Sequence, residues 1–228
     1  MSTIWLFDLD NTLHDASHAA LPEVSAAMGA YIQRELGLTQ AESDALRRDY
    51  WQRYGATLLG LVRHHGVHAG HFLDETHRLP RLEHDVRGHA HDLHALRALP
   101  GRKVLLTNAP RVYVRRVLRV LGLARFFDQV ITVEDMCMFG HLRPKPDARL
   151  FRHLAARLKV HPRRCVLVED ALENTRGARR AGMRTVWMQR WTRTATWGAA
   201  ALQRVSMRPP HVDHRVTRLH PLRRLAGR

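Results

Sequence analysis

The chain opens with a short hydrophobic run that ends in an acid. Residues 3–8 lead without interruption through apolar positions to Asp8, which is typical of a strand covered on both faces in a parallel sheet. From about residue 15 to residue 97 the apolar positions instead follow helical spacing. The helices expected there begin near Pro22, after the capping box Thr39-Gln40-Ala41-Glu42, near Leu58 and at about Asp85.

After residue 102 the pattern alternates between strands and helices. Strands are predicted over residues 103–107, 127–133, 165–168 and 185–188, with helices over 112–121, 147–158 and 172–181. This alternation predicts a doubly wound, Rossmann-like parallel sheet of the α/β class. The expected organisation is an α/β core domain of residues 1–14 and 98–228, with an all-helical cap domain of residues 15–97 inserted after the first strand. Residues 211–217 alternate like an edge strand, and residues 219–225 suit a short helix.

Composition narrows the class of protein only moderately. Hydrophobic residues make up 45% of the 228 positions, which is ordinary for a globular protein. No apolar run approaches the roughly 20 residues that cross a bilayer, so no membrane partner is expected. The two cysteines, Cys137 and Cys165, fit neither a disulfide framework nor a metal motif. We expect a cytoplasmic protein in a reducing compartment.

The net charge of +16 raises the question of a nucleic-acid partner. The charge is almost entirely arginine, because the only lysines are Lys103, Lys145 and Lys159, and it is spread along the chain. The segment from Arg190 holds nine arginines and one acid, which is half of the net charge. Such a distribution does not favour specific nucleic-acid binding, although a positive surface attracts small anionic substrates.

Two polar motifs follow the first two strands of the predicted sheet. Asp8-Leu9-Asp10-Asn11-Thr12 ends the first strand. There one carboxylate could attack phosphorus, and a second, two residues later, could serve as an acid and base. A polar turn is the ordinary alternative. Thr107-Asn108 ends the next strand, where a hydroxyl and backbone N–H groups could bind an anion or simply cap a helix.

Two further motifs carry charge. Lys145 stands between prolines in Arg143-Pro144-Lys145-Pro146-Asp147, where the backbone is held extended. It could neutralise a phosphate and nearby carboxylates, or face solvent. Glu169-Asp170 follows a buried strand, with Asn174 one helical turn later. Adjacent buried acids are costly unless a cation binds them, and oxygen ligands favour Mg²⁺; a helix cap is the alternative.

The four motifs in this order resemble the haloacid dehalogenase superfamily of phosphohydrolases, over essentially the whole chain. The resemblance implies that Asp8 is the nucleophile and Asp10 the general acid and base. It implies phosphate binding by Thr107, Asn108 and Lys145. It further implies a Mg²⁺ ion bound by Asp8, the backbone carbonyl of Asp10 and Asp170, with Glu169 and Asn174 close by. An acid at position 10 also excludes a dehalogenase, since that branch lacks it.

The predicted cap is similar to the pyrimidine 5′-nucleotidase branch. The similarity rests on Tyr50-Trp51-Gln52-Arg53-Tyr54-Gly55 with Leu58, Gly60, Leu61 and Val62, together with Phe7-Asp8-Leu9-Asp10-Asn11-Thr12-Leu13 and Thr107-Asn108-Ala109. It implies hydrolysis of UMP and CMP. The chain departs from that branch at Glu169-Asp170-Ala171, where two aspartates and a serine are common. Alternatives are a phosphatase or phosphomutase acting on a sugar phosphate or phosphoglycolate, and a non-catalytic nucleic-acid-binding module.

Aromatic and histidine clusters have a less specific interpretation. Tyr50, Trp51 and Tyr54 could stack on a nucleobase, although such a stripe is more often helix–helix core. His91 and His94 are spaced to share one helix face, but no cysteine or carboxylate set completes a metal site. Solvated surface histidines are the simpler interpretation of this pair.

Overall fold

The computed structural model describes residues 3–191 and 208–226. The chain divides into two compact units, an α/β unit of Met1–Ser17 with Val86–Arg228, and a helical unit of His18–Asp85.

A six-stranded parallel sheet forms the centre of the α/β unit. Its order is β3-β2-β1-β6-β7-β8, and every neighbouring pair is parallel. The strands are β1 (Ile4–Phe7), β2 (Arg102–Leu106), β3 (Gln129–Ile131), β6 (Cys165–Glu169), β7 (Arg184–Met188) and β8 (His214–Val216). The expected parallel α/β sheet is confirmed, and β1 lies at its centre between β2 and β6.

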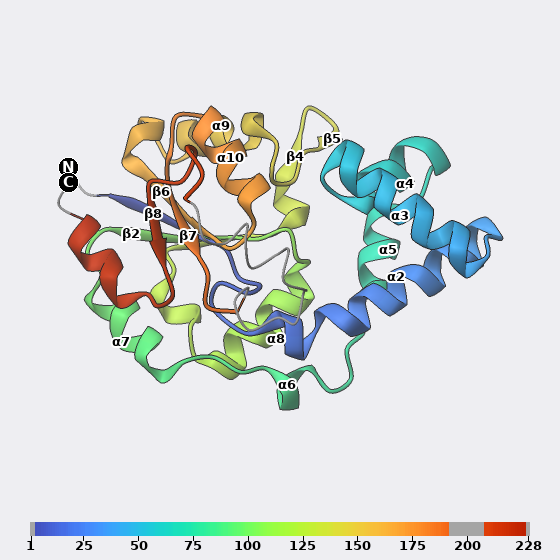
Figure 1. Ribbon diagram of the computed structural model, residues 1–228, viewed down its shortest axis with the longest axis horizontal. Coiled ribbons are helices and arrows are strands. Elements are labelled where there is room, and N and C mark those ends of the chain that lie inside the picture. Colours follow the sequence, from blue (N-terminus) through green and yellow to red (C-terminus); the bar gives the residue numbers. More distant parts are fainter. Residues whose placement is uncertain (1–2, 192–207, 227–228) are drawn as a thin grey trace. The chain divides into compact units, whose positions relative to one another are not determined.

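Helices cover both faces of this sheet (Figure 1). They are α7 (Ala90–Ala98), α8 (Arg111–Leu121), α9 (Ala148–Arg157) and α10 (Leu172–Arg180), with short 3₁₀ turns η1 (Ala124–Phe126), η2 (Val133–Met136) and η3 (Pro162–Arg164). Alternate strand residues such as Ile4 and Leu6 pack with Phe151 and Ala178 of α9 and α10 in one buried cluster. Burial of both faces explains why β1 is apolar throughout and why β2, β6 and β7 each contain a run of apolar residues.

The C-terminal segment completes the sheet edge. The expected edge strand is β8, and the expected short helix is the 3₁₀ turn η4 (His220–Leu225). Asp213 accepts hydrogen bonds from the Thr185 backbone and from Arg179, at 2.8 Å and 3.0 Å. The Thr3 hydroxyl donates to the Ala226 carbonyl at 3.2 Å, so the two ends of the described chain meet.

The helical unit contains α2 (Leu21–Leu36), α3 (Gln40–Tyr54), α4 (Thr57–His65), α5 (Ala69–Thr76) and α6 (Leu82–Asp85). The predicted capping box is present, since Thr39 Oγ1 accepts from the Glu42 N–H and Glu42 Oε2 accepts from the Thr39 N–H. Gly60 on α4 lets the Tyr50 ring of α3 lie against the backbone of α4, because a Cβ at position 60 would lie 2.2 Å from that ring.

The sequence and the structure differ in some boundaries. The helix expected over residues 85–99 is α7, which begins at Ala90 after an extended His89. This helix belongs to the α/β unit, so the helical unit ends at Asp85 rather than at residue 97. The helix α1 (Ala16–Ala19) spans the entry to that unit. The Asp15 N–H donates to the Arg87 carbonyl at 3.1 Å, which joins the entry and exit segments of the insertion.

A small hairpin was not expected from the sequence. Strands β4 (Cys137–Met138) and β5 (His141–Leu142) pair antiparallel, and their turn holds Phe139 and Gly140 at φ values of 52° and 75°. Phe139 is 92% exposed. Two-residue strands carry too little periodicity to predict.

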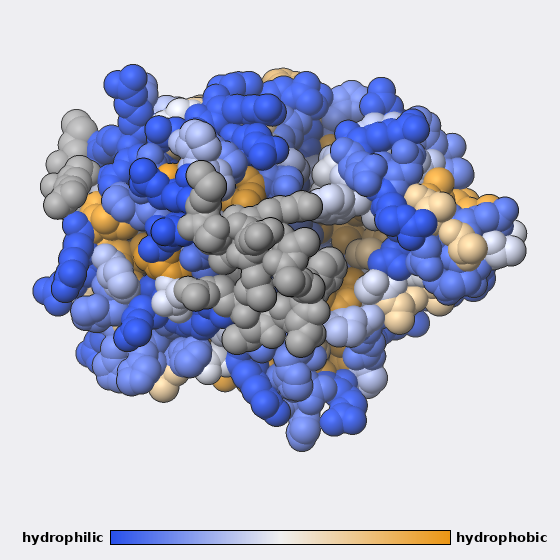
Figure 2. Space-filling view, in the orientation of Figure 1, coloured by the Kyte–Doolittle hydropathy of each residue, from blue (hydrophilic) through white to orange (hydrophobic). Residues whose placement is uncertain are grey.

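Hydrophilic side chains cover most of the surface visible in Figure 2. Among the described residues, no helix combines the length and the hydrophobicity that crossing a membrane requires.

Candidate active site

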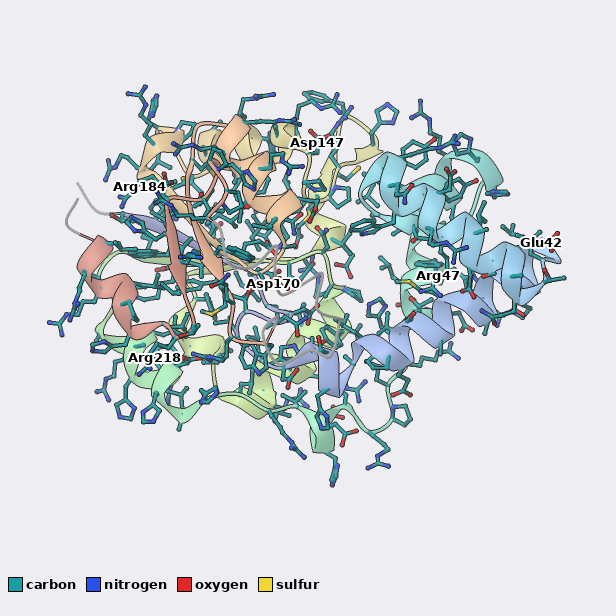
Figure 3. All side chains as sticks on the ribbon, in the orientation of Figure 1. Glu42, Arg47, Asp147, Asp170, Arg184 and Arg218 are labelled. Atoms are coloured by element: carbon teal, nitrogen blue, oxygen red, sulfur yellow. The ribbon has the colours of Figure 1, made fainter. Side chains whose placement is uncertain are left out.

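Most of the residues predicted to take part in catalysis or metal binding lie at the carboxyl ends of three adjacent strands. Asp8 follows β1, Thr107 follows β2, Glu169 ends β6 and Asp170 follows it. Asp170 is labelled in Figure 3. Because β1 lies between β2 and β6 in register, these side chains start from neighbouring positions. This edge is where open parallel sheets bind ligands.

Lys145 reaches this edge from the loop between β5 and α9. Its Nζ atom lies 2.7 Å from Asp8 Oδ1 and 2.6 Å from Glu169 Oε2. The Lys145 and Glu169 side chains are each 1% exposed. Burial alone would lower the pKa of Lys145, but the charges of Asp8 and Glu169 outweigh it and raise that pKa. The ammonium therefore stays charged and joins two carboxylates.

The backbone of Lys145 is fixed by Asn108. The Asn108 side chain accepts from the Lys145 N–H at 3.0 Å and donates to the Lys145 carbonyl at 2.9 Å. Because both ends of its side-chain amide are used in this way, Asn108 positions residues 143–147 (the lysine loop). Its remaining contribution to an anion site would come from its backbone N–H.

Close backbone contact also holds the lysine loop against α10. A Cβ atom added at Gly177 would lie 2.1 Å from the carbonyl oxygen of Pro146, which is nearer than any real side chain approaches. Glycine at this position therefore allows the segment after Lys145 to lie directly on the helix that follows Asp170.

Three carboxylates gather beside the ammonium. Oxygens of Asp8, Glu169 and Asp170 lie within 4.8 Å of one another, and these residues form the one such group of potential metal ligands among the described residues. Burial, then the charge of Glu169, raises the pKa of Asp8 to about 7 despite Lys145. Burial and the charges of Glu169 and Asp8 raise the pKa of Asp170 as well. One ammonium does not balance this charge, and an oxygen-only donor set fits Mg²⁺.

This carboxylate group differs in one member from the ligand set expected from the sequence. Glu169, expected as a neighbour of the metal, belongs to the group, although its Oε2 is held by Lys145 and its Oε1 accepts from the Ala171 N–H at 3.3 Å. Asn174 lies half-buried in the first turn of α10, and its role beside a metal stays a prediction.

Thr107 lies buried at the end of β2, with 1% of its surface exposed. Its Oγ1 accepts from the Ala109 N–H at 3.1 Å, which shapes the turn before α8. Asn11 in the first motif adopts a left-handed conformation, with φ of 54°, and its side chain accepts from the Ser17 N–H at 3.0 Å. Asparagine tolerates this conformation better than most residues.

Two contacts to Asp10 were missed by the sequence analysis. The Tyr113 hydroxyl donates to Asp10 Oδ1 at 2.7 Å, and His14 Nε2 lies 2.9 Å from the same oxygen. Burial, then the charge of Asp10, raises the pKa of Tyr113 well above its ordinary value. The four-residue spacing of Asp10 and His14 was visible in the sequence, whereas nothing there marked Tyr113.

The three aromatic residues of α3 differ in their surroundings. Tyr50 is 7% exposed, and its hydroxyl lies 2.7 Å from His65 Nε2. The Tyr54 hydroxyl lies 2.6 Å from His64 Nε2, while Trp51 is 55% exposed. Tyr50 is thus part of the helical core, and a role of these residues in specificity stays a prediction.

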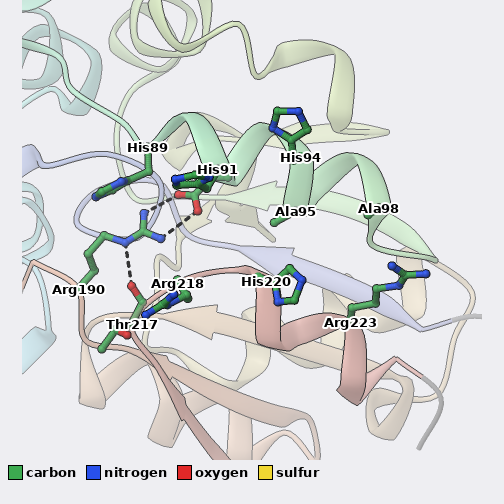
Figure 4. A pocket seen from close by; sticks show the side chains of 11 residues that line it. His89, His91, His94, Ala95, Ala98, Arg190, Thr217, Arg218, His220 and Arg223 are labelled. Atoms are coloured by element: carbon green, nitrogen blue, oxygen red, sulfur yellow. Dashed lines mark hydrogen bonds and ion pairs between the residues drawn. The ribbon is translucent and has the colours of Figure 1, made fainter.

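A separate cavity of about 630 Å³ lies within the α/β unit, between α7 and the segment that follows β8 (Figure 4). His91 and His94 line it with His89, His220 and three arginines. On one side Arg190 binds buried Asp92 through both terminal nitrogens and donates to the Thr217 carbonyl at 2.8 Å. None of the predicted catalytic residues lines this cavity.

Curated proteins of similar sequence span nearly the same length. The chain is 28% identical over 211 residues to a validoxylamine A 7′-phosphate phosphatase of Streptomyces hygroscopicus subsp. limoneus, covering 89% of this chain and 90% of that protein. It is 27% identical over 194 residues to a glyceraldehyde 3-phosphate phosphatase of Methanothermobacter thermautotrophicus, covering 79% and 82%.

A solved structure and a family model also match this chain. A Bacillus subtilis hydrolase of the haloacid dehalogenase type, YfnB, solved with bound magnesium, matches with a TM-score of 0.61 and 18% identity over 100% of this chain and 99% of that one. The family model for a haloacid dehalogenase-like hydrolase matches residues 4–182, which include every strand-end motif described above. The chain therefore belongs to the haloacid dehalogenase-like hydrolases.

Proposed function

We propose that this protein is a Mg²⁺-dependent phosphomonoesterase that forms an aspartyl-phosphate on Asp8. The observation that carries the proposal is the placement of the Lys145 ammonium between Asp8 and Glu169, with Asp170 alongside. A buried carboxylate beside a cation is suited to attack an anionic phosphate, because the cation offsets the repulsion between the two anions.

In the proposed reaction, an Asp8 oxygen forms a bond to phosphorus while the bond to the leaving oxygen breaks. Asp10 gives its proton to that leaving oxygen. Asp10 then removes a proton from water, whose oxygen bonds to phosphorus as the bond between Asp8 and phosphorus breaks and phosphate departs. Thr107 and the N–H groups near Asn108 bind the phosphoryl oxygens, and Lys145 balances their charge.

Mg²⁺ would be held by Asp8, Asp170 and the Asp10 carbonyl, where it supplies positive charge that stabilises the transferring phosphoryl group. Support comes from the oxygen-only cluster and from the magnesium bound by the Bacillus subtilis protein. The excess of buried carboxylates over ammonium groups also favours a divalent cation.

Two classes of phosphomonoester are proposed as substrates. The sequence of the helical unit favours UMP and CMP. The names of the two curated relatives favour phosphates of sugars and of sugar-like molecules. Because Tyr50 is buried and hydrogen-bonded to His65, it is a weak candidate for base stacking, and this favours the second class. Phosphoglycolate hydrolysis and phosphomutase activity use the same residues.

Phosphate release from nucleoside monophosphates, sugar phosphates and phosphoglycolate tests the proposal. Each substrate is incubated with Mg²⁺, with EDTA, and with Asp8→Asn protein. The exposed Asp74 on α5 supplies a matched carboxylate-to-amide control. We expect metal-dependent release that Asp8→Asn abolishes and Asp74→Asn leaves unchanged.

Other outcomes separate the alternatives. Full activity of Asp8→Asn would refute the nucleophile. The absence of release from every substrate, combined with salt-sensitive retention on DNA, would favour the non-catalytic nucleic-acid-binding module. Conversion between sugar phosphate isomers without net release of phosphate would indicate a mutase.

A further inference from the structure

Two side chains, those of Tyr113 and His14, contact one oxygen of Asp10. Tyr113 Oη lies 2.7 Å and His14 Nε2 2.9 Å from Oδ1, and the Tyr113 oxygen is itself 3.2 Å from His14 Nε2. His14 is fully buried and Tyr113 is 2% exposed, whereas the Asp10 side chain is 27% exposed. Two rigid rings thus hold the buried side of a carboxylate that reaches the surface.

The hydrogen positions follow from the donors that the rings can offer. The Tyr113 hydroxyl donates to Oδ1. His14 Nδ1 is buried without a hydrogen-bond partner among the described residues, so a proton on Nδ1 would leave a buried N–H unsatisfied. A proton on Nε2 instead points toward Oδ1 and the Tyr113 oxygen. Both rings therefore act as donors, and Oδ1 is an acceptor.

We infer that Tyr113 and His14 are positioning residues that assign the transferred proton to Oδ2 of Asp10. This inference rests on the proposed phosphatase function. A proton on Oδ1 would meet the hydrogens of Tyr113 and His14, so the proton occupies Oδ2. It passes from Oδ2 to the leaving oxygen as the Asp8–phosphorus bond forms and the bond to the leaving group breaks. Water later returns a proton to Oδ2 as the aspartyl-phosphate on Asp8 is hydrolysed.

Neither ring contacts the phosphate in this scheme. Their loss should therefore weaken proton transfer more than substrate binding. The effect should also depend on the leaving group, since an alkoxide needs the proton and p-nitrophenolate barely does. A purely structural role in packing would affect both kinds of substrate equally.

The experiment compares Tyr113→Phe with wild type on p-nitrophenyl phosphate and on the best alkyl phosphate of the substrate panel. The value of kcat/KM reports aspartyl-phosphate formation, the step that expels the leaving group. For the alkyl phosphate we expect kcat/KM to fall by about 10- to 100-fold, with less than about 3-fold loss for p-nitrophenyl phosphate. The variant should also show a burst of p-nitrophenolate, because Asp10 is then less well placed to take a proton from water in the second step.

Tyr31→Phe is the matched control. Tyr31 is likewise buried, at 3% exposure, and its hydroxyl lies 2.9 Å from His71 Nδ1 in the helical unit. This variant should leave both kcat/KM values within 2-fold of wild type. His14→Gln, which offers an N–H from a similar position, should retain more activity on the alkyl phosphate than His14→Leu.

Equal losses on the two substrates in a folded Tyr113→Phe protein, or no loss on either, would overturn the positioning role. That result is distinguishable from failure of the proposed function, because wild type would still be active and Asp8→Asn would still be inactive. Wild type that releases no phosphate from either substrate would overturn both.

Discussion

The ammonium of Lys145 lies 2.7 Å from Oδ1 of Asp8, and the two side chains are only 1% and 6% exposed. Removing the ammonium leaves buried carboxylates without a cation, which typically costs about 3–5 kcal/mol. Lys145→Met should therefore lower the free energy of unfolding by about that amount in EDTA, measured by urea denaturation.

The same variant should lose at least about 100-fold in kcat, as when one group that stabilises transition-state charge is removed. Combining Lys145→Met with Glu169→Gln should recover part of the stability but none of the activity. A single variant as stable as wild type would contradict the charge balance described here.

Mg²⁺ should stabilise the folded protein through the Asp8–Glu169–Asp170 group. At about 100 times the dissociation constant, the expected gain is about 2.7 kcal/mol, which raises Tm by several degrees in a thermal melt. EDTA should reverse the shift. Asp170→Asn removes one of the mutually repelling carboxylates, so we expect it to melt no lower than wild type without metal and to gain less from Mg²⁺.

Asp74→Asn is the control variant for that experiment. This control should gain as much from Mg²⁺ as wild type does. An equal shift in Asp170→Asn would place the cation elsewhere.

Gly177→Ala should damage both stability and activity, although Gly177 carries no functional group. The added Cβ would lie 2.1 Å from the Pro146 carbonyl oxygen, so α10 or the lysine loop must move. We expect a loss of about 1–3 kcal/mol and a lower kcat.

Gly29→Ala is a suitable comparison, because a Cβ there would lie 3.6 Å from the ends of flexible Arg47 and Gln40 side chains. It should be neutral, or stabilising by up to about 1 kcal/mol. If Gly177→Ala behaved like Gly29→Ala in denaturation and phosphate release, the close contact would have no consequence.

The Asp92–Arg190 pair should behave as a buried structural link. The side chains are 4% and 11% exposed, so Arg190→Met leaves an uncompensated carboxylate and should cost about 3–5 kcal/mol. The double variant Asp92→Leu/Arg190→Met should regain much of that loss. A double variant no more stable than the single one, in urea denaturation, would show that Arg190 acts through other contacts.

The sequence was sufficient for the parts of the site that depend on sheet topology. Asp8, Thr107 and Asp170 each follow an apolar strand, and parallel strands bring their carboxyl ends to one edge. Tyr113 could not be found in this way, because its contact with Asp10 depends on how α8 crosses the sheet. The use of the Asn108 amide on the Lys145 backbone likewise depends on loop geometry, which has no periodic signature.

The hydrogen bond between the Asp15 N–H and the Arg87 carbonyl has a consequence for the folding of the chain. The segment of residues 18–85 leaves the α/β unit and returns to it through residues that lie next to each other. In the chain of the α/β unit it is therefore a closed loop. The entropy of closing a loop grows only slowly with its length. Residues 18–85 could therefore be lengthened, shortened or exchanged for another sequence at little thermodynamic cost to the sheet that holds Asp8.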